Sequence, residues 1–207
     1  GQVKDTQDIE NLISVPLTTG GELSANFETH LREYNITLKE HVSVKEISET
    51  ADENYRIHLN TGETFETRSI ILATGAQWRK LGVAGEEENI GKGVAFCAHC
   101  DGPFFKGKDI AVVGGGNSGI EAALDLAGIV KHVTVLEFAD DLKADQVLIN
   151  KAKEKANIDI ITSAATQEIK ATDGKVSSIV YQDRGSSENK ELDVAGVFVQ
   201  IGLISNS

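Results

Sequence analysis

The two cysteines of the chain stand three positions apart, in the stretch Cys97-Ala98-His99-Cys100. Two thiols at this spacing can close a small disulfide ring that forms and breaks by thiol–disulfide exchange. A zinc site would need about four ligands, whereas the chain has two cysteines and its histidines show no ligand spacing. An inert pair of small core residues is the other alternative. The spacing therefore favours redox exchange and predicts no metal site.

Asp101 follows Cys100 directly and could supply the proton that thiol exchange requires. The same residue opens Asp101-Gly102-Pro103, which is also favourable turn chemistry, so a turn or helix-cap role is an equal alternative. His99 could lower the pKa of a neighbouring thiol through its charge, or it could be an exposed histidine without a role. We expect Cys97, Cys100 and Asp101 to be the catalytic residues.

A glycine-rich loop, Gly114-Gly115-Gly116-Asn117-Ser118-Gly119, follows a β-favouring run and precedes apolar residues at helical spacing. In this strand–loop–helix context, the Gly-x-Gly-x-x-Gly pattern is typical of a dinucleotide site. Gly114 permits the tight turn, Gly116 lets a pyrophosphate approach the backbone, and Gly119 lets the helix pack closely on the strand. The helix N-terminus then offers free N–H groups to the phosphates. A glycine-rich turn without a ligand is the alternative.

Glu137 follows this loop by about 20 residues, at the end of the next β-favouring run. A carboxylate at that place can accept hydrogen bonds from a ribose 2′-hydroxyl. A 2′-phosphate would meet like charge there, and the following Phe138-Ala139 supplies no compensating cation. Glu137 therefore favours NAD(H) over NADP(H), with an ordinary solvated carboxylate as the alternative.

The first part of the chain must form a helix and short strands. Apolar Leu23, Phe27 and Leu31 recur at helical spacing and predict a helix over Glu22–Tyr34 with one buried stripe. The unalternated apolar run Ser69–Ala73 predicts a strand buried on both faces. Short β-favouring runs between them are typical of an antiparallel meander: Ile36–Leu38, His41–Ile47, Tyr55–Leu59 and Thr64–Glu66.

The second part alternates strands and helices, as a parallel α/β sheet requires. Residues 82–93 are rich in Gly and Glu without periodicity and are expected to link two domains. An Asp173-Gly174 turn predicts a hairpin. The expected strands are Asp109–Val113, His132–Leu136, Ile158–Ile161, Ala165–Lys170, Val176–Asp183 and Glu191–Ile201, and the expected helices run from the glycine loop to about Gly128 and over Asp145–Ala156.

Length and charge set the broad class. The chain has 207 residues, of which 40% are hydrophobic, enough for two domains of ordinary size. A net charge of -12 argues against nucleic acid and anionic membrane surfaces as partners. No run approaches the roughly 20 apolar residues of a membrane span, and no signal pattern opens the chain. We therefore expect a cytoplasmic protein.

With these residues in place, the chain resembles the flavoprotein reductases of alkyl hydroperoxide systems (the F component of alkyl hydroperoxide reductase), relatives of the low-molecular-weight thioredoxin reductases. The resemblance covers all 207 residues and is most specific from Lys92 to Leu148. Thioredoxin reductases typically carry a basic His-Arg-Arg segment where this chain has Glu137-Phe138-Ala139, which favours NADH, and His99 points the same way. The chain departs from the family at Ala98 and in Gly202–Ser207, where a proline is usual. The motifs that carry the resemblance are Cys-Ala-His-Cys-Asp-Gly-Pro-Phe-Phe-Lys-Gly-Lys, Gly-Gly-Gly-Asn-Ser-Gly-Ile-Glu-Ala-Ala, Val-Leu-Glu-Phe-Ala and Lys-Ala-Asp-Gln-Val-Leu.

The resemblance implies the α/β fold of flavoprotein disulfide reductases, which have two dinucleotide-binding domains. Residues 81–204 would form a complete Rossmann-like NAD(H) domain carrying the redox pair. Residues 1–80 would form an incomplete FAD domain, to which residues 205–207 begin to return. The glycine loop of the flavin domain, its closing Gly-Asp motif and an N-terminal thioredoxin-like module are expected outside this sequence. The implied partial FAD site consists of Gly1, Gln2, Asn11, Ala73, Thr74 and Gly75.

The implied function is electron transfer from NADH to FAD, to the Cys97–Cys100 disulfide, and on to a peroxiredoxin that reduces alkyl hydroperoxides. Cys100 would face the flavin, Cys97 would exchange with the dithiol of the thioredoxin-like module, and Asp101 would match the acid of the family. The parent protein would be a homodimer, and the 207-residue chain alone is expected to be inactive. The alternatives are an NADPH-dependent thioredoxin reductase and a non-enzymatic NAD- or redox-sensing module.

Overall fold

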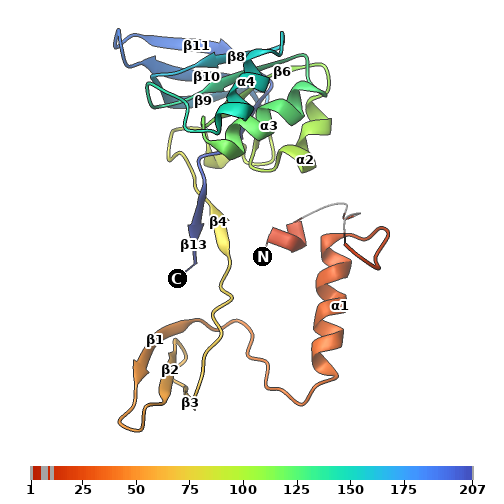
Figure 1. The fold of residues 1–207 in the computed structure, drawn as a ribbon, viewed down its shortest axis with the longest axis vertical. Helices are drawn as coiled ribbons and strands as arrows, with labels where there is room; N and C mark the ends of the chain where they lie inside the picture. Colours follow the sequence, from red (N-terminus) through yellow and green to blue (C-terminus); the bar gives the residue numbers. More distant parts are fainter. Residues whose placement is uncertain (1, 6–8, 10–11, 207) are drawn as a thin grey trace. The chain divides into compact units, whose positions relative to one another are not determined.

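A parallel sheet of five strands, in the order β5-β12-β6-β7-β8, organises the larger part of the chain. In the computed structural model, which describes residues 2–5, 9 and 12–206, the chain divides into two units, Gly1–Gly75 and Ala76–Asn206. The sheet belongs to the second unit (Figure 1). Its strands are β5 (Val94–Ala95), β6 (Asp109–Val113), β7 (His132–Leu136), β8 (Ile158–Ile161) and β12 (Gly196–Val199).

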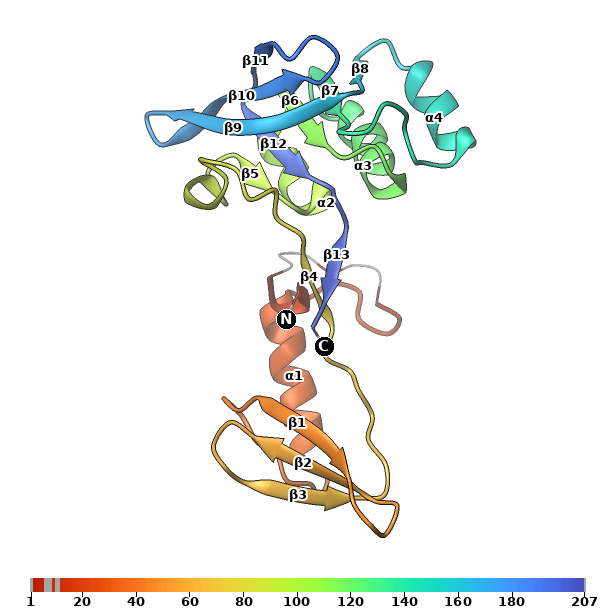
Figure 2. The same ribbon diagram turned by 90° about the vertical axis from the view of Figure 1, so that its left-hand side faces the viewer.

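The sheet is buried on both faces, because different layers cover them (Figures 1 and 2). Ile110 and Val112 of β6 pack toward the helices. The alternate residues, Ala111 and Val113, pack toward the antiparallel sheet. Since successive side chains of a strand point to opposite faces, an uninterrupted apolar run suits this position. The covering helices are α2 (Ala98–Asp101), α3 (Asn117–Ala127) and α4 (Gln146–Lys153), and the unit also contains the short 3-10 helices η2 (Glu87–Asn89) and η3 (Gly102–Phe105).

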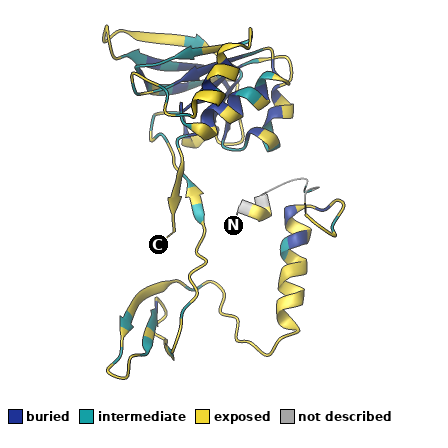
Figure 3. Ribbon diagram, viewed as in Figure 1, coloured by how far each residue is buried: buried dark blue, intermediate teal, exposed yellow. Residues whose placement is uncertain are grey.

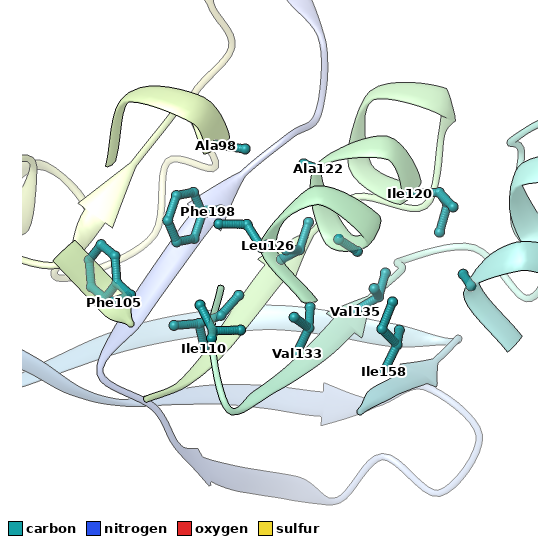
Figure 4. Close-up of a cluster of buried hydrophobic side chains, with 14 of the residues drawn as sticks. Ala98, Phe105, Ile110, Ile120, Ala122, Leu126, Val133, Val135, Ile158 and Phe198 are labelled. Carbon is teal, nitrogen blue, oxygen red and sulfur yellow. The ribbon is translucent and has the colours of Figure 1, made fainter. Parts of the chain in front are cut away.

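The core on the helix side joins α2 and α3 to the sheet (Figure 4). Ile120 and Leu126 of α3 are fully buried in the same cluster as Val133 and Val135 of β7. Phe198 of β12 meets the ring of Phe105 edge-on, at 5.3 Å between centroids. This packing holds the helix that begins at the glycine loop and the short helix that contains Cys100 on one rigid surface.

The opposite face is covered by the antiparallel sheet β11-β10-β9, as Figure 2 shows. The turn between β9 and β10 places Asp173 at φ 53° and Gly174 at φ 75°. Two successive positive φ angles are the conformation that a tight hairpin turn needs and that Asp-Gly favours, so the predicted turn is confirmed. The strands are β9 (Ala164–Thr172), β10 (Lys175–Asp183) and β11 (Asn189–Asp193).

Residues 82–93, expected to be a linker, lie inside the second unit. Glu86 is fully buried, and its carboxylate accepts hydrogen bonds from the backbone N–H groups of Leu81 (2.8 Å) and Gly82 (2.7 Å). The expectation of a linker was wrong because a buried charge paired with backbone N–H groups orders this segment without any hydrophobic period. Nearby, β4 (Ala76–Trp78) pairs antiparallel with β13 (Leu203–Ser205).

The first unit contains one long helix and a three-stranded meander. The helix begins with a capping box, in which the Thr19 hydroxyl accepts from the Glu22 N–H and the Glu22 carboxylate accepts from the Thr19 N–H. Two of the predicted strands shift: Ile36–Leu38 forms no strand, and the next begins at Val44 rather than His41. The elements are η1 (Gln2–Asp5), α1 (Gly20–Arg32), β1 (Val44–Glu49), β2 (Tyr55–Leu59) and β3 (Thr64–Thr67).

Two predicted burials in the first unit were wrong (Figure 3). Leu23 is buried, but Phe27 is 55% exposed and Leu31 is 39% exposed, so α1 has no continuous buried stripe. The run Ser69–Ala73 forms no strand, and Ile71 is 94% exposed. A strand buried on both faces needs hydrogen-bonded neighbours and covering layers. In the described part of the chain, no strand pairs with this run.

Candidate redox and nucleotide site

The two cysteines form a disulfide at the beginning of α2. Cys97 is the N-cap residue of this helix, and its Sγ accepts a hydrogen bond from the Cys100 N–H at 3.2 Å. Both cysteines are half-buried, whereas Ala98 between them is buried in the core under the helices. The disulfide is thus anchored through Ala98 while its sulfurs remain partly accessible, as exchange with a second dithiol requires.

Asp101 lies at the end of α2, and its N–H donates to the Cys97 carbonyl at 3.1 Å. Burial raises the pKa of the Asp101 carboxyl, and a hydrogen bond with the backbone of Cys97 partly opposes that effect. The side chain makes no cap hydrogen bond to η3, which weakens the alternative of a cap residue. A carboxyl that keeps its proton to a higher pH than usual, next to a disulfide, is suited to proton donation.

His99 points away from this chemistry. Its side chain is 83% exposed, and its Nε2 lies 3.4 Å from an Asp125 carboxylate oxygen on α3. The geometry favours the exposed alternative over a role beside the thiols.

The glycine loop has the close contacts that its sequence predicts. Gly114 has φ 121°, and a Cβ there would lie 2.3 Å from the Gln200 carbonyl oxygen. A Cβ at Gly119 would lie 1.8 Å from the Gly114 carbonyl oxygen. At Gly116, by contrast, a Cβ would meet no atom within 4 Å. The outer glycines are therefore required by packing, and the middle one leaves open space where a pyrophosphate would lie against the backbone.

Asn117 has a structural task beside this loop. Its side-chain amide donates to the Asp145 carboxylate at 3.1 Å, and its side-chain oxygen accepts from the Asp145 N–H at 2.7 Å. These two bonds tie the beginning of α3 to the beginning of α4. Ser118 is exposed in the first turn of α3.

A pocket of about 390 Å³ opens beside the loop, at the carboxyl ends of β6, β7 and β12. This is the edge at which parallel α/β sheets bind nucleotides. The sequence reasoning missed Lys143, Gln200, Ile201 and Gly202. Gln200 directly follows β12, so its place at the end of a parallel strand was the signal that could have found it. The pocket is lined by Gly114, Gly115, Gly116, Asn117, Ser118, Glu137, Lys143, Gln200, Ile201 and Gly202.

Glu137 is half-buried at the end of β7 and is not a freely solvated carboxylate. One carboxylate oxygen accepts from the Gly115 N–H at 2.5 Å, and the other accepts from the Ala139 N–H at 2.8 Å. The absence of a nearby cation, expected from Phe138-Ala139, was wrong. The guanidinium of Arg184 lies 4.3 Å from the centre of the Phe138 ring. Its position 46 residues away in sequence hid this contact.

The residues of the implied FAD site belong to the other unit. Ala73, Thr74 and Gly75 lie in an exposed segment without regular structure, and Gly75 has φ 71°. Gln2 lies in η1, while Gly1 and Asn11 lie outside the described residues. The FAD contacts therefore remain an expectation from the resemblance.

A protein-family model described as pyridine nucleotide-disulphide oxidoreductase matches residues 7–207. The chain belongs to this family. This pyridine nucleotide-disulphide oxidoreductase is 50% identical over 207 residues to the F component of alkyl hydroperoxide reductase of Staphylococcus aureus (strain NCTC 8325 / PS 47), covering 100% of this chain and 40% of that protein. It is 49% identical over 209 residues to the protein of the same name from Escherichia coli (strain K12), with the same coverage. The chain thus spans about 40% of the length of these relatives.

Solved structures of thioredoxin reductases share the fold of this pyridine nucleotide-disulphide oxidoreductase. The enzyme of T. acidophilum superposes with a TM-score of 0.70 at 33% identity, covering 100% of this chain and 66% of that one. The enzyme of Streptococcus pyogenes MGAS5005 gives 0.74 at 33% identity, covering 98% and 65%. The predicted fold class and the resemblance to the flavoprotein component of alkyl hydroperoxide reductase are confirmed.

Two searches of the described residues give no further site. No group of three or more His, Cys, Asp or Glu among them could hold a metal ion. Within the same residues, no helix has both the length and the apolar character needed to cross a bilayer.

Proposed function

We propose that the protein is an NADH-dependent flavoprotein disulfide reductase whose Cys97–Cys100 disulfide delivers electrons to a peroxiredoxin that reduces alkyl hydroperoxides. The observation that carries the proposal is the disulfide at the start of α2, packed on α3, whose own N-terminus opens on the glycine-loop pocket. The relatives named as the F component of alkyl hydroperoxide reductase support the choice of pathway. A homodimeric, cytoplasmic parent protein that uses a thioredoxin-like module rests on the resemblance alone.

In this proposal, the bound nicotinamide and flavin supply an electron pair to the disulfide. Two electrons and two protons convert the Cys97–Cys100 disulfide into two thiols, and Asp101 is placed to deliver one of the protons. The Cys97 thiolate then attacks the next disulfide and forms a mixed disulfide. Cys100 attacks Cys97 Sγ, which closes the ring again and releases the partner as a dithiol. The Cys100 N–H that donates to Cys97 Sγ supports a thiolate at Cys97.

The nucleotide pocket supports the dinucleotide part of the proposal. Gly116 leaves the open space that a pyrophosphate requires, and the first turn of α3 offers its N–H groups. Glu137 places a carboxylate where an adenosine 2′-phosphate would lie, which favours NADH. Residues Ala73, Thr74 and Gly75, with Gly1, Gln2 and Asn11, would contribute to holding FAD.

The test uses the full-length flavoprotein under anaerobic conditions. NADH should reduce both the flavin and the disulfide, so two thiols should become available per chain. Cys97→Ser and Cys100→Ser should both retain flavin reduction by NADH and lose peroxide reduction through the peroxiredoxin. Flavin absorbance and thiol titration follow the two steps separately. Peroxide turnover that persists in Cys97→Ser would rule out the relay.

The structural neighbours named thioredoxin reductases make an NADPH-dependent thioredoxin reductase the second candidate. The ratio of kcat/KM for NADH to that for NADPH separates the two. A clear preference for NADPH, together with turnover of thioredoxin, would favour the second candidate and contradict the role proposed for Glu137.

A further inference from the structure

Phe138, directly after Glu137, combines exposure with a fixed cationic neighbour. Its side chain is 62% exposed at the end of β7. The Arg184 guanidinium lies over the ring at 4.3 Å from the centroid, and an Arg184 N–H donates to the Phe138 carbonyl at 2.8 Å. An aromatic ring held from behind by a guanidinium is a rigid stacking surface, because a cation over the ring restricts its movement.

The backbone fixes Arg184 in this position. Arg184 is the first residue after β10, and its backbone N–H donates to the Ser163 carbonyl at 2.8 Å. The preceding Asp183 accepts from the N–H groups of Gly185 (2.9 Å) and Ser186 (3.2 Å) through its side chain. The loop between β10 and β11 is therefore held in a defined shape, which directs Arg184 toward the end of β7.

Asp140 balances the charge of this arginine. One of its carboxylate oxygens lies 3.5 Å from an Arg184 guanidinium nitrogen and accepts from the Ser163 hydroxyl at 2.8 Å. Phe138, Asp140, Ser163 and Arg184 together are called the Arg184 clamp below. The clamp joins the segment after Glu137 to two loops of the antiparallel sheet.

We propose that the Arg184 clamp is the adenine-binding and coenzyme-discriminating element of the nucleotide pocket. The inference rests on the proposed function, in which Glu137 binds the adenosine ribose. The adenine is attached to that same ribose, so it must lie within the reach of one ring from Glu137, where Phe138 is the exposed aromatic side chain. Asp140 neutralises Arg184, so the guanidinium supports the ring and offers little attraction to a 2′-phosphate.

The first arm of the test separates adenine binding from general damage. In the full-length flavoprotein, Phe138→Ala and Arg184→Ala should each weaken NADH binding by about tenfold, the order of one base–aromatic contact. Binding of reduced nicotinamide mononucleotide, which lacks the adenosine half, should stay unchanged. Phe138→Trp should restore NADH affinity. Equal losses for both ligands, or no loss for NADH, would overturn the inference.

The second arm tests discrimination. Asp140→Asn removes the counter-charge of Arg184 and should raise kcat/KM for NADPH relative to NADH by about tenfold, the order of one charge-assisted contact. The double variant Asp140→Asn/Arg184→Ala should lose that gain. A gain that persists in the double variant, or none in the single one, contradicts the assignment.

Failure of the clamp differs visibly from failure of the proposed function. If the wild-type protein binds NADH and the clamp variants bind it equally well, the clamp assignment alone is wrong. If the wild-type protein binds neither NADH nor ADP-ribose, both the proposed function and the clamp are wrong.

Discussion

Asp101 shows how one side chain acquires a chemical task from its surroundings. Its carboxyl is partly buried beside the Cys97 backbone, and this burial raises its pKa. Position in the sequence left a turn role and an acid role equally open, because Asp-Gly-Pro suits both. The missing cap hydrogen bond and the direction of the pKa shift favour the acid. Neither can be read from residue types, since both depend on what the fold places around the carboxyl.

Asp101→Asn is expected to slow proton-coupled reduction of the Cys97–Cys100 disulfide by about a hundredfold, the lower end of general acid catalysis. Because the pKa of Asp101 is raised, the carboxyl keeps its proton above its usual range and loses it as the pH rises through the raised value. The wild-type rate should therefore fall over that range, and the variant should show a low and flat profile. Rapid-mixing kinetics across the acid range measure both.

The same shift has a consequence for stability. A carboxyl with a raised pKa binds its proton more tightly in the folded state, so stability falls as the pH rises above the unfolded pKa. Asp101→Asn should remove this dependence. Asp125→Asn, at the carboxylate beside exposed His99, is the matched control and should leave the kinetic profile unchanged. If both variants flatten the profile equally, Asp101 is not the acid.

At the scale of elements, the glycine loop was predictable because its determinants are local. The apolar run of β6, the loop and the helical spacing of α3 are contiguous in sequence, and the structure reproduces them closely. The position of Glu137 at the end of β7 was predictable for the same reason. Arg184 was not, because its contact with Phe138 depends on how the β10–β11 loop meets the end of β7. Local patterns thus predicted the pocket, while residues brought by distant elements escaped them.

Two glycine substitutions separate packing from binding in this loop. Gly119→Ala places a Cβ against the Gly114 carbonyl, so it should destabilise the second unit by about 1–3 kcal/mol, the usual cost of overpacking. Gly116→Ala meets no protein atom, and φ there is -82°, which alanine tolerates. It should change stability by less than about 1 kcal/mol and still abolish NADH binding, because the methyl group fills the space for the pyrophosphate.

Thermal unfolding and NADH titration measure the two effects in the same preparations. Gly128→Ala is a control, because a Cβ there would lie near the Asp125 carbonyl oxygen, and Gly128 is not among the pocket residues. Normal NADH affinity in Gly116→Ala would mean that the pyrophosphate does not lie against this glycine.

At the scale of the molecule, burial is distributed unevenly between the two units. The second unit has hydrophobic clusters on both faces of its parallel sheet. In the described part of the first unit, the buried hydrophobic residues are Leu23 and Leu59. The apolar run Ser69–Ala73 misled the sequence prediction for this reason. Hydrophobicity indicates that a segment has apolar surface to cover, but the covering partner decides whether it becomes a strand.

This distribution predicts that the units differ in their resistance to local unfolding. Amides of β6, β7 and β12 should exchange with solvent only in the global opening of the second unit, because they lie between two packed layers. Amides of α1 should exchange far sooner. Phe198→Ala, which removes a fully buried ring, should destabilise the second unit by about 3–5 kcal/mol.

Hydrogen exchange followed by mass spectrometry tests this prediction residue range by residue range. In Phe198→Ala, protection should drop throughout β6, β7 and β12 together and stay unchanged in α1. Leu59→Ala should do the reverse, lowering protection in β1–β3 and leaving the parallel sheet intact. The expected independence follows from the division of the chain into two units. If either substitution lowered protection in both sets of elements, the units would fold as one cooperative body, and the nucleotide site would depend on the whole chain.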